Sequence, residues 1–510
     1  MRLAELTVAL SLATDLGTGQ PLEHGLRTCW LSLRAAEELG LDGSTRSCVY
    51  YTALLRFVGC TSDAADTAVL AGGDDLAFNG VMAPMLMAQP GEAMRYFARH
   101  VAEDLPAPRR IGRVVRSLTD PSGSSRSLAQ HCEVGARLAS RLGLGFSVTR
   151  SLAHAYERWD GKGDPAGLAG EAVPLAVRIV TVARDLEMWV RLTGWAVATD
   201  VLARRRGHSY DPAVVDVVLA SGERWLIETP DDCCTAVLDA EPAPVAMLGV
   251  DGVDGVLAAV ADFTDLKSPW LRGHSTGVAD LVAAAAETAG LPDPAVTELR
   301  RAALVHDVGR VGIPNKIWDH PGPLTTEQWE RVRMHPYFTE RVLRRCPQLL
   351  DVADLASRHH ERVDGSGYHR RSTAKELTFN ARLLAAADAY HAMTEDRPHR
   401  PRMAATVAAS VLLDELHAGR FDHTEVDAVL TAAGQASGRS RAAHPAGLTD
   451  REVEVLRLIA RGHANKQVAA ALGISPKTAG RHVEHIYAKA GVATRAGATL
   501  FAMENGLLTP

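Results

Sequence analysis

Residues 304–309 read Leu-Val-His-Asp-Val-Gly and end a segment in which apolar residues recur with helical spacing. His306 lies on the same helical stripe as Leu299 and Ala302, so its side chain is expected to point inward. Burial of an imidazole beside the carboxyl group of Asp307 is costly unless both groups find partners. The pair therefore predicts a polar site in the protein interior, at the end of a helix.

Other histidines and an aspartate occupy inward positions of the same kind within residues 262–434. Eleven of the 20 histidines of the chain lie in this interval. A single buried histidine is usually an ordinary core residue with its own hydrogen bond. That explanation must hold at every position at once, whereas convergence on metal ions satisfies all of these groups together. The candidate metal ligands are His274, His306, Asp307, His335, His359, His360 and Asp388.

The order and spacing of these residues resemble the HD-GYP branch of the HD-domain metal-dependent phosphohydrolases. The resemblance covers residues 262–434 and rests on His274, His306-Asp307-Val308-Gly309, His335-Pro336, His359-His360-Glu361, Asp364-Gly365-Ser366-Gly367-Tyr368 and Asp388. It implies a helical domain that hydrolyses a phosphodiester such as a cyclic dinucleotide. It also implies two divalent transition metals as cofactors, either iron or manganese, with zinc as an alternative.

The same resemblance assigns roles to individual residues. One metal would be held by His274, His306, Asp307 and Asp388. The second metal would be held by Asp307, His335, His359 and His360, so that Asp307 bridges the pair. The candidate catalytic residues are Asp307 and Arg310. The candidate phosphate and substrate ligands are Arg310, Lys316, Tyr368, Arg397 and Arg400.

Three residues depart from the HD-GYP pattern. Arg310 stands where lysine is usual, which exchanges a compact ammonium for a planar guanidinium. His369 replaces the proline of Gly-Tyr-Pro. Trp270 lies one helical turn before His274, where three-metal members carry glutamate, so we expect two metals. The alternative to hydrolysis is a non-catalytic transcription factor that senses a metal or a nucleotide.

The first half of the chain repeats this pattern in degenerate form. Arg56 follows His24 by 32 residues, the same interval that separates His306 from the first ligand of the second half. Only His24 and His131 keep a ligand-type side chain at the corresponding positions. Arg56 and Arg184 stand where ligands are expected, and a cation at these places excludes a metal. We therefore expect the first copy to bind no metal.

Residues 448–510 form a small basic segment attached to an acidic body. They carry eight Lys or Arg and five Asp or Glu, a net charge of +3, whereas the whole chain of 510 residues has −6. Thr449 and Glu452 have the spacing of a capping box, and Ser475-Pro476 starts a later helix after a glycine-containing turn. Helix, turn and helix in this order are typical of a DNA-binding module.

This segment closely resembles the LuxR-type DNA-binding domain. The resemblance rests on Leu448-Thr449, Arg451-Glu452, Asn465-Lys466, Ile474-Ser475-Pro476-Lys477-Thr478 and His482-Val483. LuxR-type modules generally bind as dimers, so we expect a homodimer on promoter DNA. The candidate DNA contacts are Lys477, Thr478, Arg481, His482, His485 and Lys489.

The predicted fold is all-α, with two HD-domain helical bundles followed by a small four-helix LuxR-type module. Ala- and Leu-rich runs with helical spacing favour this class over strands. No signal-peptide pattern and no bilayer-length apolar segment occur, so we expect a cytoplasmic protein with no membrane partner. The predicted segments are a degenerate HD-GYP-like domain (1–230), a linker (231–261), an HD-GYP-like domain (262–434), a linker (435–446) and a LuxR-type domain (447–510).

Overall fold

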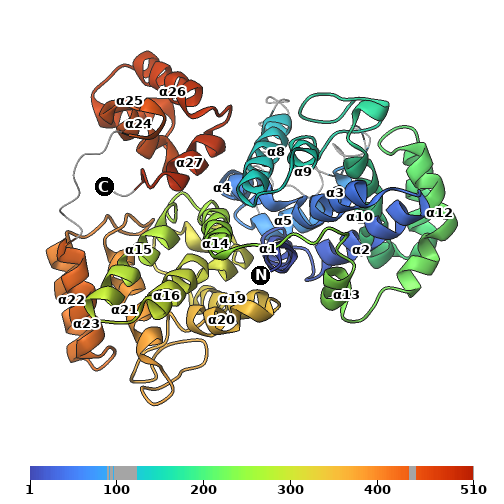
Figure 1. Ribbon diagram of the computed structural model, residues 1–510. Helices are drawn as coiled ribbons and strands as arrows, with labels where there is room; N and C mark the ends of the chain where they lie inside the picture. Colours follow the sequence, from blue (N-terminus) through green and yellow to red (C-terminus); the bar gives the residue numbers. More distant parts are fainter. Residues whose placement is uncertain (89–90, 92–95, 97–122, 436–443, 509–510) are drawn as a thin grey trace. The chain divides into compact units, whose positions relative to one another are not determined.

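The computed structural model describes residues 1–88, 91, 96, 123–435 and 444–508. Within these ranges the chain is built from helices, and its β-type contacts are isolated bridges, which confirms the predicted all-α fold. Among the described helices, none has both the length and the apolar character of a bilayer span. The chain divides into two compact units, residues 1–253 and 254–510 (Figure 1).

The first unit contains the degenerate copy. Its helices are α1 (Leu3–Gly17), α2 (His24–Glu38), α3 (Gly43–Leu55), α4 (Ala64–Ala71), α5 (Asp75–Met82), α8 (Gly123–Arg141), α9 (Phe146–Ala153), α10 (Leu175–Thr193), α11 (Trp195–Arg205), α12 (Pro212–Ile227) and α13 (Cys233–Asp239). A 3₁₀ turn, η1 (Val58–Asp63), follows α3. Helices α2, α3 and α10 pack against one another and form the centre of this unit.

The second unit repeats this arrangement. Its first helices are α14 (Val250–Asp265), α15 (His274–Thr288), α16 (Asp293–Val305), α17 (Asn315–Trp318), α18 (Thr326–Val332), α19 (His335–Leu343), α20 (Leu350–Ala356), α21 (Phe379–Met393), α22 (Ala405–His417) and α23 (His423–Gln435). Helix α15 packs against α16 and α21, as α2 packs against α3 and α10. The 3₁₀ turn η4 (Val308–Gly312) contacts α19, as η1 contacts α8.

A glycine in each 3₁₀ turn explains the last residue of the His-Asp-Val-Gly motif. A Cβ at Gly309 would lie 2.1 Å from the carbonyl oxygen of His335, and a Cβ at Gly59 would lie 2.0 Å from that of His131. Any side chain at either position would clash with backbone. The motif glycine therefore reflects a close packing of turn on helix that both copies retain.

Buried carboxylates hold equivalent turns in the two copies. Asp15 accepts a hydrogen bond from the backbone N–H of Gly25 at 3.1 Å. Asp265 accepts one from the backbone N–H of Ser275 at 2.9 Å. Each of these amides belongs to the residue after the first ligand position, so the chain enters α2 and α15 in the same way. Neither contact involves a candidate metal ligand side chain.

The segment 231–261, for which we expected a linker, is largely helical and contains α13 and most of α14. Asp232 caps α13 by accepting a hydrogen bond from the N–H of a residue in its first turn. Glu241, which follows α13, accepts hydrogen bonds from Arg2 Nε at 3.0 Å and from the hydroxyl of Tyr51 at 2.7 Å. Of the polar residues in this segment, Asp232 thus starts α13, and Glu241 ties the end of that helix to Arg2 and Tyr51 of the first unit.

The C-terminal module has four helices around a small apolar core. They are α24 (Asp450–Ala460), α25 (Asn465–Leu472), α26 (Pro476–Ala490) and α27 (Arg495–Glu504). Ser475 caps α26 by accepting the N–H of Thr478 at 3.0 Å, and Gly473 ends α25 with a φ of 65°. The predicted helix-turn-helix is therefore present. The preceding segment 435–446, expected as a linker, lies mostly outside the described residues.

Candidate metal centre and DNA-binding surface

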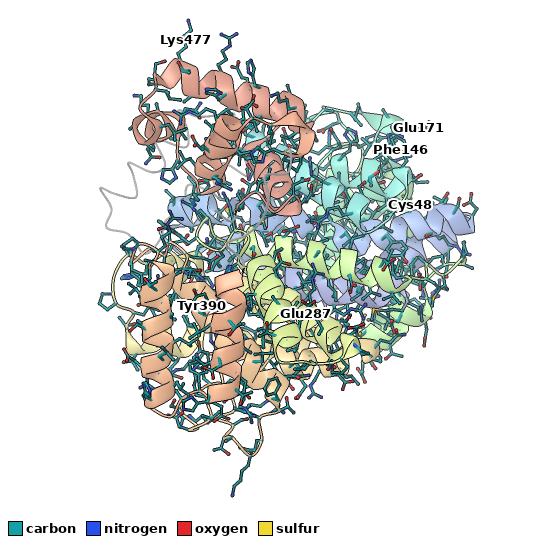
Figure 2. All side chains as sticks on the ribbon, turned by 60° about the vertical axis from the view of Figure 1, so that its left-hand side comes forward. Cys48, Phe146, Glu171, Glu287, Tyr390 and Lys477 are labelled. Atoms are coloured by element: carbon teal, nitrogen blue, oxygen red, sulfur yellow. The ribbon has the colours of Figure 1, made fainter. Side chains whose placement is uncertain are left out.

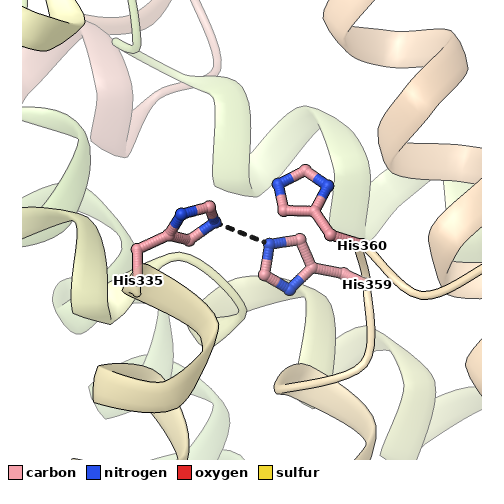
Figure 3. A group of neighbouring side chains, drawn as sticks. All are labelled: His335, His359 and His360. Atoms are coloured by element: carbon pink, nitrogen blue, oxygen red, sulfur yellow. Dashed lines mark hydrogen bonds between the residues drawn. The ribbon is translucent and has the colours of Figure 1, made fainter. Parts of the chain in front are cut away.

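Five structural elements of the second unit bring the candidate ligands together. His274 opens α15, His306-Asp307 follows α16, His335 opens α19, His359-His360 follows α20, and Asp388 lies on α21. All of these side chains are buried except that of His360, which is partly exposed. Figure 3 shows His335, His359 and His360 with their rings close together. Segments far apart in sequence thus converge on one interior point.

The carboxylate of Asp307 lies between two groups of ligands. Its Oδ2 is 3.5 Å from His274 Nε2 and 3.1 Å from His306 Nε2. Its Oδ1 is 3.5 Å from His335 Nε2 and 3.4 Å from His359 Nε2. One oxygen faces each group, which is the arrangement that a carboxylate bridging two cations requires.

Asp388 completes the first group. Its Oδ1 lies 3.2 Å from His274 Nε2, and its Oδ2 lies 3.7 Å from His360 Nδ1. Several of the converging atoms are buried and have no hydrogen-bond partner, namely Nε2 of His274 and His306, both carboxylate oxygens of Asp307 and Oδ1 of Asp388. Buried polar atoms left without partners are costly, and bound cations would satisfy them together.

The outer ring nitrogens fix the orientation of the histidines. Nδ1 of His306 donates to the carbonyl oxygen of Ala303 at 2.6 Å, and Nδ1 of His359 donates to that of Ala356 at 2.6 Å. Nδ1 of His335 is likewise directed at a backbone carbonyl. In the neutral rings of His335 and His359 the proton then lies on Nδ1, so their Nε2 atoms, 3.1 Å apart, present two lone pairs to each other (Figure 3). A cation between them removes this repulsion.

The protonation states also suit metal binding. Burial lowers the pKa of His335, His359 and His360, which keeps these rings in the neutral, ligating form. Burial opposes ionisation of Asp307, but Arg310 and His306 outweigh it and hold its pKa well below the ordinary value. Burial also opposes protonation of His306, yet the two neighbouring aspartates raise its pKa to about 10. A proton on His306 thus balances part of the aspartate charge, and a metal bound to this ring would displace that proton.

Three of the five candidate phosphate ligands lie next to this cluster. Arg310 is buried, with Nε 2.8 Å from Asp307 Oδ2 and its guanidinium carbon 4.8 Å from the ring centroid of Trp318. The ring centroid of Tyr368 is 4.7 Å from that of His360. Arg397 Nη2 is 3.4 Å from Nδ1 of His274.

The other two candidates are placed differently. Lys316 is exposed on α17. Arg400 donates to backbone carbonyls near the end of α21, including that of Ala392 at 2.7 Å, so it acts as a helix cap. Arg397 and Arg400 nevertheless line one pocket of about 420 Å³ together with Trp270, Asp396, Pro398, His399 and Pro401.

Sequence reasoning missed two residues behind His274. Glu395 Oε2 lies 2.8 Å from His274 Nδ1, and His391 Nδ1 lies 3.4 Å from the same atom. A carboxylate in this position orients a ligating histidine and raises its basicity. Helical spacing was an available signal for His391, which lies three residues after Asp388 on α21, but not for Glu395, which lies beyond the end of this helix.

Comparison with known proteins identifies the fold that carries this cluster. Residues 100–214 and 258–424 match the HD domain family. The chain belongs to the HD-domain family. Residues 446–502 of this HD-domain protein match the bacterial regulatory proteins of the luxR family. Both resemblances predicted from the sequence are therefore confirmed.

Several relatives of this HD-domain protein are cyclic-dinucleotide phosphodiesterases by name. The 3'3'-cGAMP-specific phosphodiesterase 3 of Vibrio cholerae is 30% identical over 421 residues, which cover 81% of this chain and 91% of the relative. A crystal structure of a V. cholerae cyclic GMP-AMP-specific phosphodiesterase superposes with a TM-score of 0.61 at 27% identity, covering 85% of this chain and 98% of the other. A cyclic di-GMP phosphodiesterase of Pseudomonas aeruginosa is 40% identical over 128 residues, or 25% of this chain and 31% of the relative.

Among its described residues, the first HD copy presents no comparable ligand set. Its Arg56 and Arg184 are buried at the positions of His306 and Asp388. His24 pairs through Nδ1 with Glu187. The copy therefore keeps the HD frame and replaces the centre of the site with guanidinium groups.

The LuxR-type module exposes part of its predicted DNA-binding face. Lys477 and Arg481 are exposed on α26, and Figure 2 shows Lys477 projecting from the start of this helix. Thr478 and His485 are also exposed, whereas His482 is partly buried. Lys489 differs because its Nζ is 2.7 Å from Glu452 Oε2. That contact ties α26 to α24.

Proposed function

We propose that residues 262–434 form a two-metal phosphodiesterase for a cyclic dinucleotide, fused to a module that binds promoter DNA. The observation that carries this proposal is the carboxylate of Asp307, whose two oxygens face separate sets of histidines. Imidazole and carboxylate ligands of this kind suit iron or manganese, with zinc as an alternative. The names of the relatives support a cyclic dinucleotide as the substrate class.

Two bound cations would activate water and polarise the phosphodiester for in-line displacement. The residues of the chain supply the setting for that chemistry. Asp307 joins the two ligand groups, and Arg310 lies against it with a guanidinium suited to a phosphate oxygen. The ring of Tyr368 lies against that of His360, at the edge of the second ligand group.

One observation favours a second candidate function, the sensing of a nucleotide without hydrolysis. Arg310 Nε lies 2.8 Å from the Asp307 oxygen that faces the first ligand group, so a guanidinium competes with a cation for this oxygen. If the competition keeps that site partly empty, binding can persist without turnover. The two functions therefore differ in catalysis and not in the ligand class.

The test uses the full-length protein prepared anaerobically. Metal content is measured first, and cyclic di-GMP and 3'3'-cGAMP are then supplied separately and their linear products quantified. We expect hydrolysis of at least one by the wild type and none by Asp307→Ala. A metal-loaded wild type that binds but never cleaves either compound would support the sensor and contradict the phosphodiesterase.

The module is tested by binding to promoter DNA at one fixed salt concentration, because affinity depends steeply on salt. We propose that five residues of α26 face the DNA, namely Lys477, Thr478, Arg481, His482 and His485. Their positions on this helix, which follows the turn of the helix-turn-helix, support the proposal. The contact of Lys489 with Glu452 gives this lysine a structural role as well. Homodimerisation and a cytoplasmic location stay predictions.

A further inference from the structure

The first HD copy buries two guanidinium groups where the second copy carries metal ligands. Arg56 takes the place of His306 and is 4% exposed, and Arg184 takes the place of Asp388 and is 2% exposed. Both guanidinium carbons lie 5.5 Å from the ring centroid of Phe57, which itself stands where Asp307 stands in the second copy. The first copy thus carries fixed positive charge where the second copy carries candidate metal ligands.

The two arginines differ in how far this copy neutralises them. Arg184 pairs with Asp185 and donates through Nη2 to the carbonyl oxygen of Ala83 at 2.8 Å. Asp185 also accepts from the hydroxyl of Tyr210. Among the described residues Arg56 has no ion pair, and its Nε and Nη1, like Nε of Arg184, are buried without a hydrogen-bond partner.

In the described part of the chain the carboxylates around Arg56 already have partners, and one of them, Asp185, pairs with Arg184. Asp63 is engaged by His131, whose Nε2 lies 2.7 Å from its Oδ1. Cys60 and Tyr156 contact each other at 3.2 Å, and burial raises the pKa of the Tyr156 hydroxyl, so it stays neutral. A guanidinium does not lose its proton in a protein, so the buried charge cannot be removed by titration. An anion from outside the chain would neutralise it.

We propose that Arg56 and Arg184 bind the phosphate group of a nucleotide in the first HD copy without hydrolysing it. A guanidinium offers planar, paired donors that match phosphate oxygens. The copy lacks the ligands for a metal, since Ala155 and Arg56 replace the second-copy histidines at these positions. This proposal goes beyond the phosphodiesterase of the second copy because its residues all lie in the first unit.

Binding is measured by titration calorimetry on full-length protein carrying Asp307→Ala, which removes the metal centre from the comparison. Inorganic phosphate and a cyclic dinucleotide are titrated separately, which distinguishes a free anion from a nucleotide phosphate. We expect one site per chain for at least one of these probes. Addition of Arg56→Met, which has a similar length but no charge, should weaken that binding by about tenfold or more.

The matched control is Arg204→Met in the same background. Arg204 is exposed on α11 and pairs with Asp200 at 2.9 Å. Its replacement by methionine removes the same charge from the same copy and leaves Arg56 and Arg184 in place. We expect this control to bind as tightly as the background. Equal affinity in the Arg56→Met and Arg204→Met proteins, or no binding of either probe to the background, would overturn the proposal.

Thermal unfolding distinguishes a variant that has lost binding from one that has failed to fold. In phosphate-free buffer Arg56→Met should unfold at the same or a higher temperature than the background, since an uncompensated buried charge has been removed. The bound probe should raise the unfolding temperature of the background but not that of Arg56→Met. Arg56→Lys keeps the charge without the planar fork, and binding as tight as the background in this variant would contradict guanidinium recognition.

Discussion

Helix α16 of the second HD copy ends just before His306, and the equivalent helix α3 of the first copy ends just before Arg56. The neighbouring helices pack in the same way in both copies, and the glycine of the following turn meets the same backbone obstacle. Yet one copy gathers imidazoles and carboxylates, and the other gathers guanidinium groups. The helical scaffold therefore does not determine what the site binds, and a few side chains decide which kind of ligand each copy attracts.

The largest effect that would sharpen this contrast is loss of both metals in Asp307→Ala. Each oxygen of Asp307 faces one ligand group, so we expect metal content to fall from about two ions per chain to near zero. Elemental analysis of purified protein measures it. Asp351→Ala, an exposed aspartate on α20, should keep both ions. Retention of two ions in Asp307→Ala would contradict the assigned centre.

A smaller effect on metal binding is expected from Glu395, which contacts the ligand His274. Glu395→Gln should weaken metal binding by about 10–100-fold, because an amide orients the ring of His274 less firmly than a carboxylate does. Competition with a chelator gives the affinity. Glu287→Gln on α15, exposed and far from the ligands in sequence, serves as the control (Figure 2). Identical affinities for the two variants would exclude a positioning role for Glu395.

Substitutions in the DNA-binding module should change promoter affinity without changing the metal content of the HD copies. Arg481→Ala removes an exposed cation from α26 and should weaken promoter binding by about 1–3 kcal/mol at fixed salt, with unchanged metal content. Gel-shift titration measures the change. Arg420→Ala removes a charge of the same sign from the second HD copy and should leave DNA affinity unaltered. If both variants lose affinity equally, the effect is general electrostatics.

The contact between α24 and α26 should contribute less. Burial opposes ionisation of Glu452, but Lys489 and the N–H of Thr449 lower its pKa to about 2. A depressed carboxyl pKa stabilises the fold above about pH 4.5, and this contribution is lost as the pH falls toward 2. Glu452→Gln should therefore reduce hydrogen-exchange protection of α24 at neutral pH by no more than about 1 kcal/mol. The difference from wild type should vanish in acid, and a constant difference would refute the ionic contribution.

Substitution of the two histidines of the first copy is expected to have no effect on metal content. His24→Ala and His131→Ala should leave metal content unchanged, because these histidines pair with Glu187 and Asp63 beside buried arginines. Elemental analysis of each variant decides the matter. A drop toward half of the wild-type metal content would mean that the first copy also holds an ion, and the contrast between the copies would fail.

The sequence was enough to predict the all-α class and which residues converge, because a ligand such as His306 is fixed by helical spacing and a local motif, but it did not predict the helices within 231–261. Glu395 escaped this reasoning because it lies beyond the end of α21, where the turn of the chain decides what it reaches. Lys489 shares the basic face of α26, but its pairing with Glu452 depends on the packing of two helices. Contacts set by tertiary packing are not readable from a single helix.

The carboxylates of Asp15 and Asp265 bear on the order in which this protein matures. Each holds the entry of a central helix through a backbone amide, in a copy with metal ligands and in a copy without them. The scaffold is therefore expected to form on the nascent chain before any ion arrives. Metal can then be acquired, exchanged or lost by a protein whose central helices are already in place, so the supply of metal in the cell would set the fraction of protein that carries the complete centre.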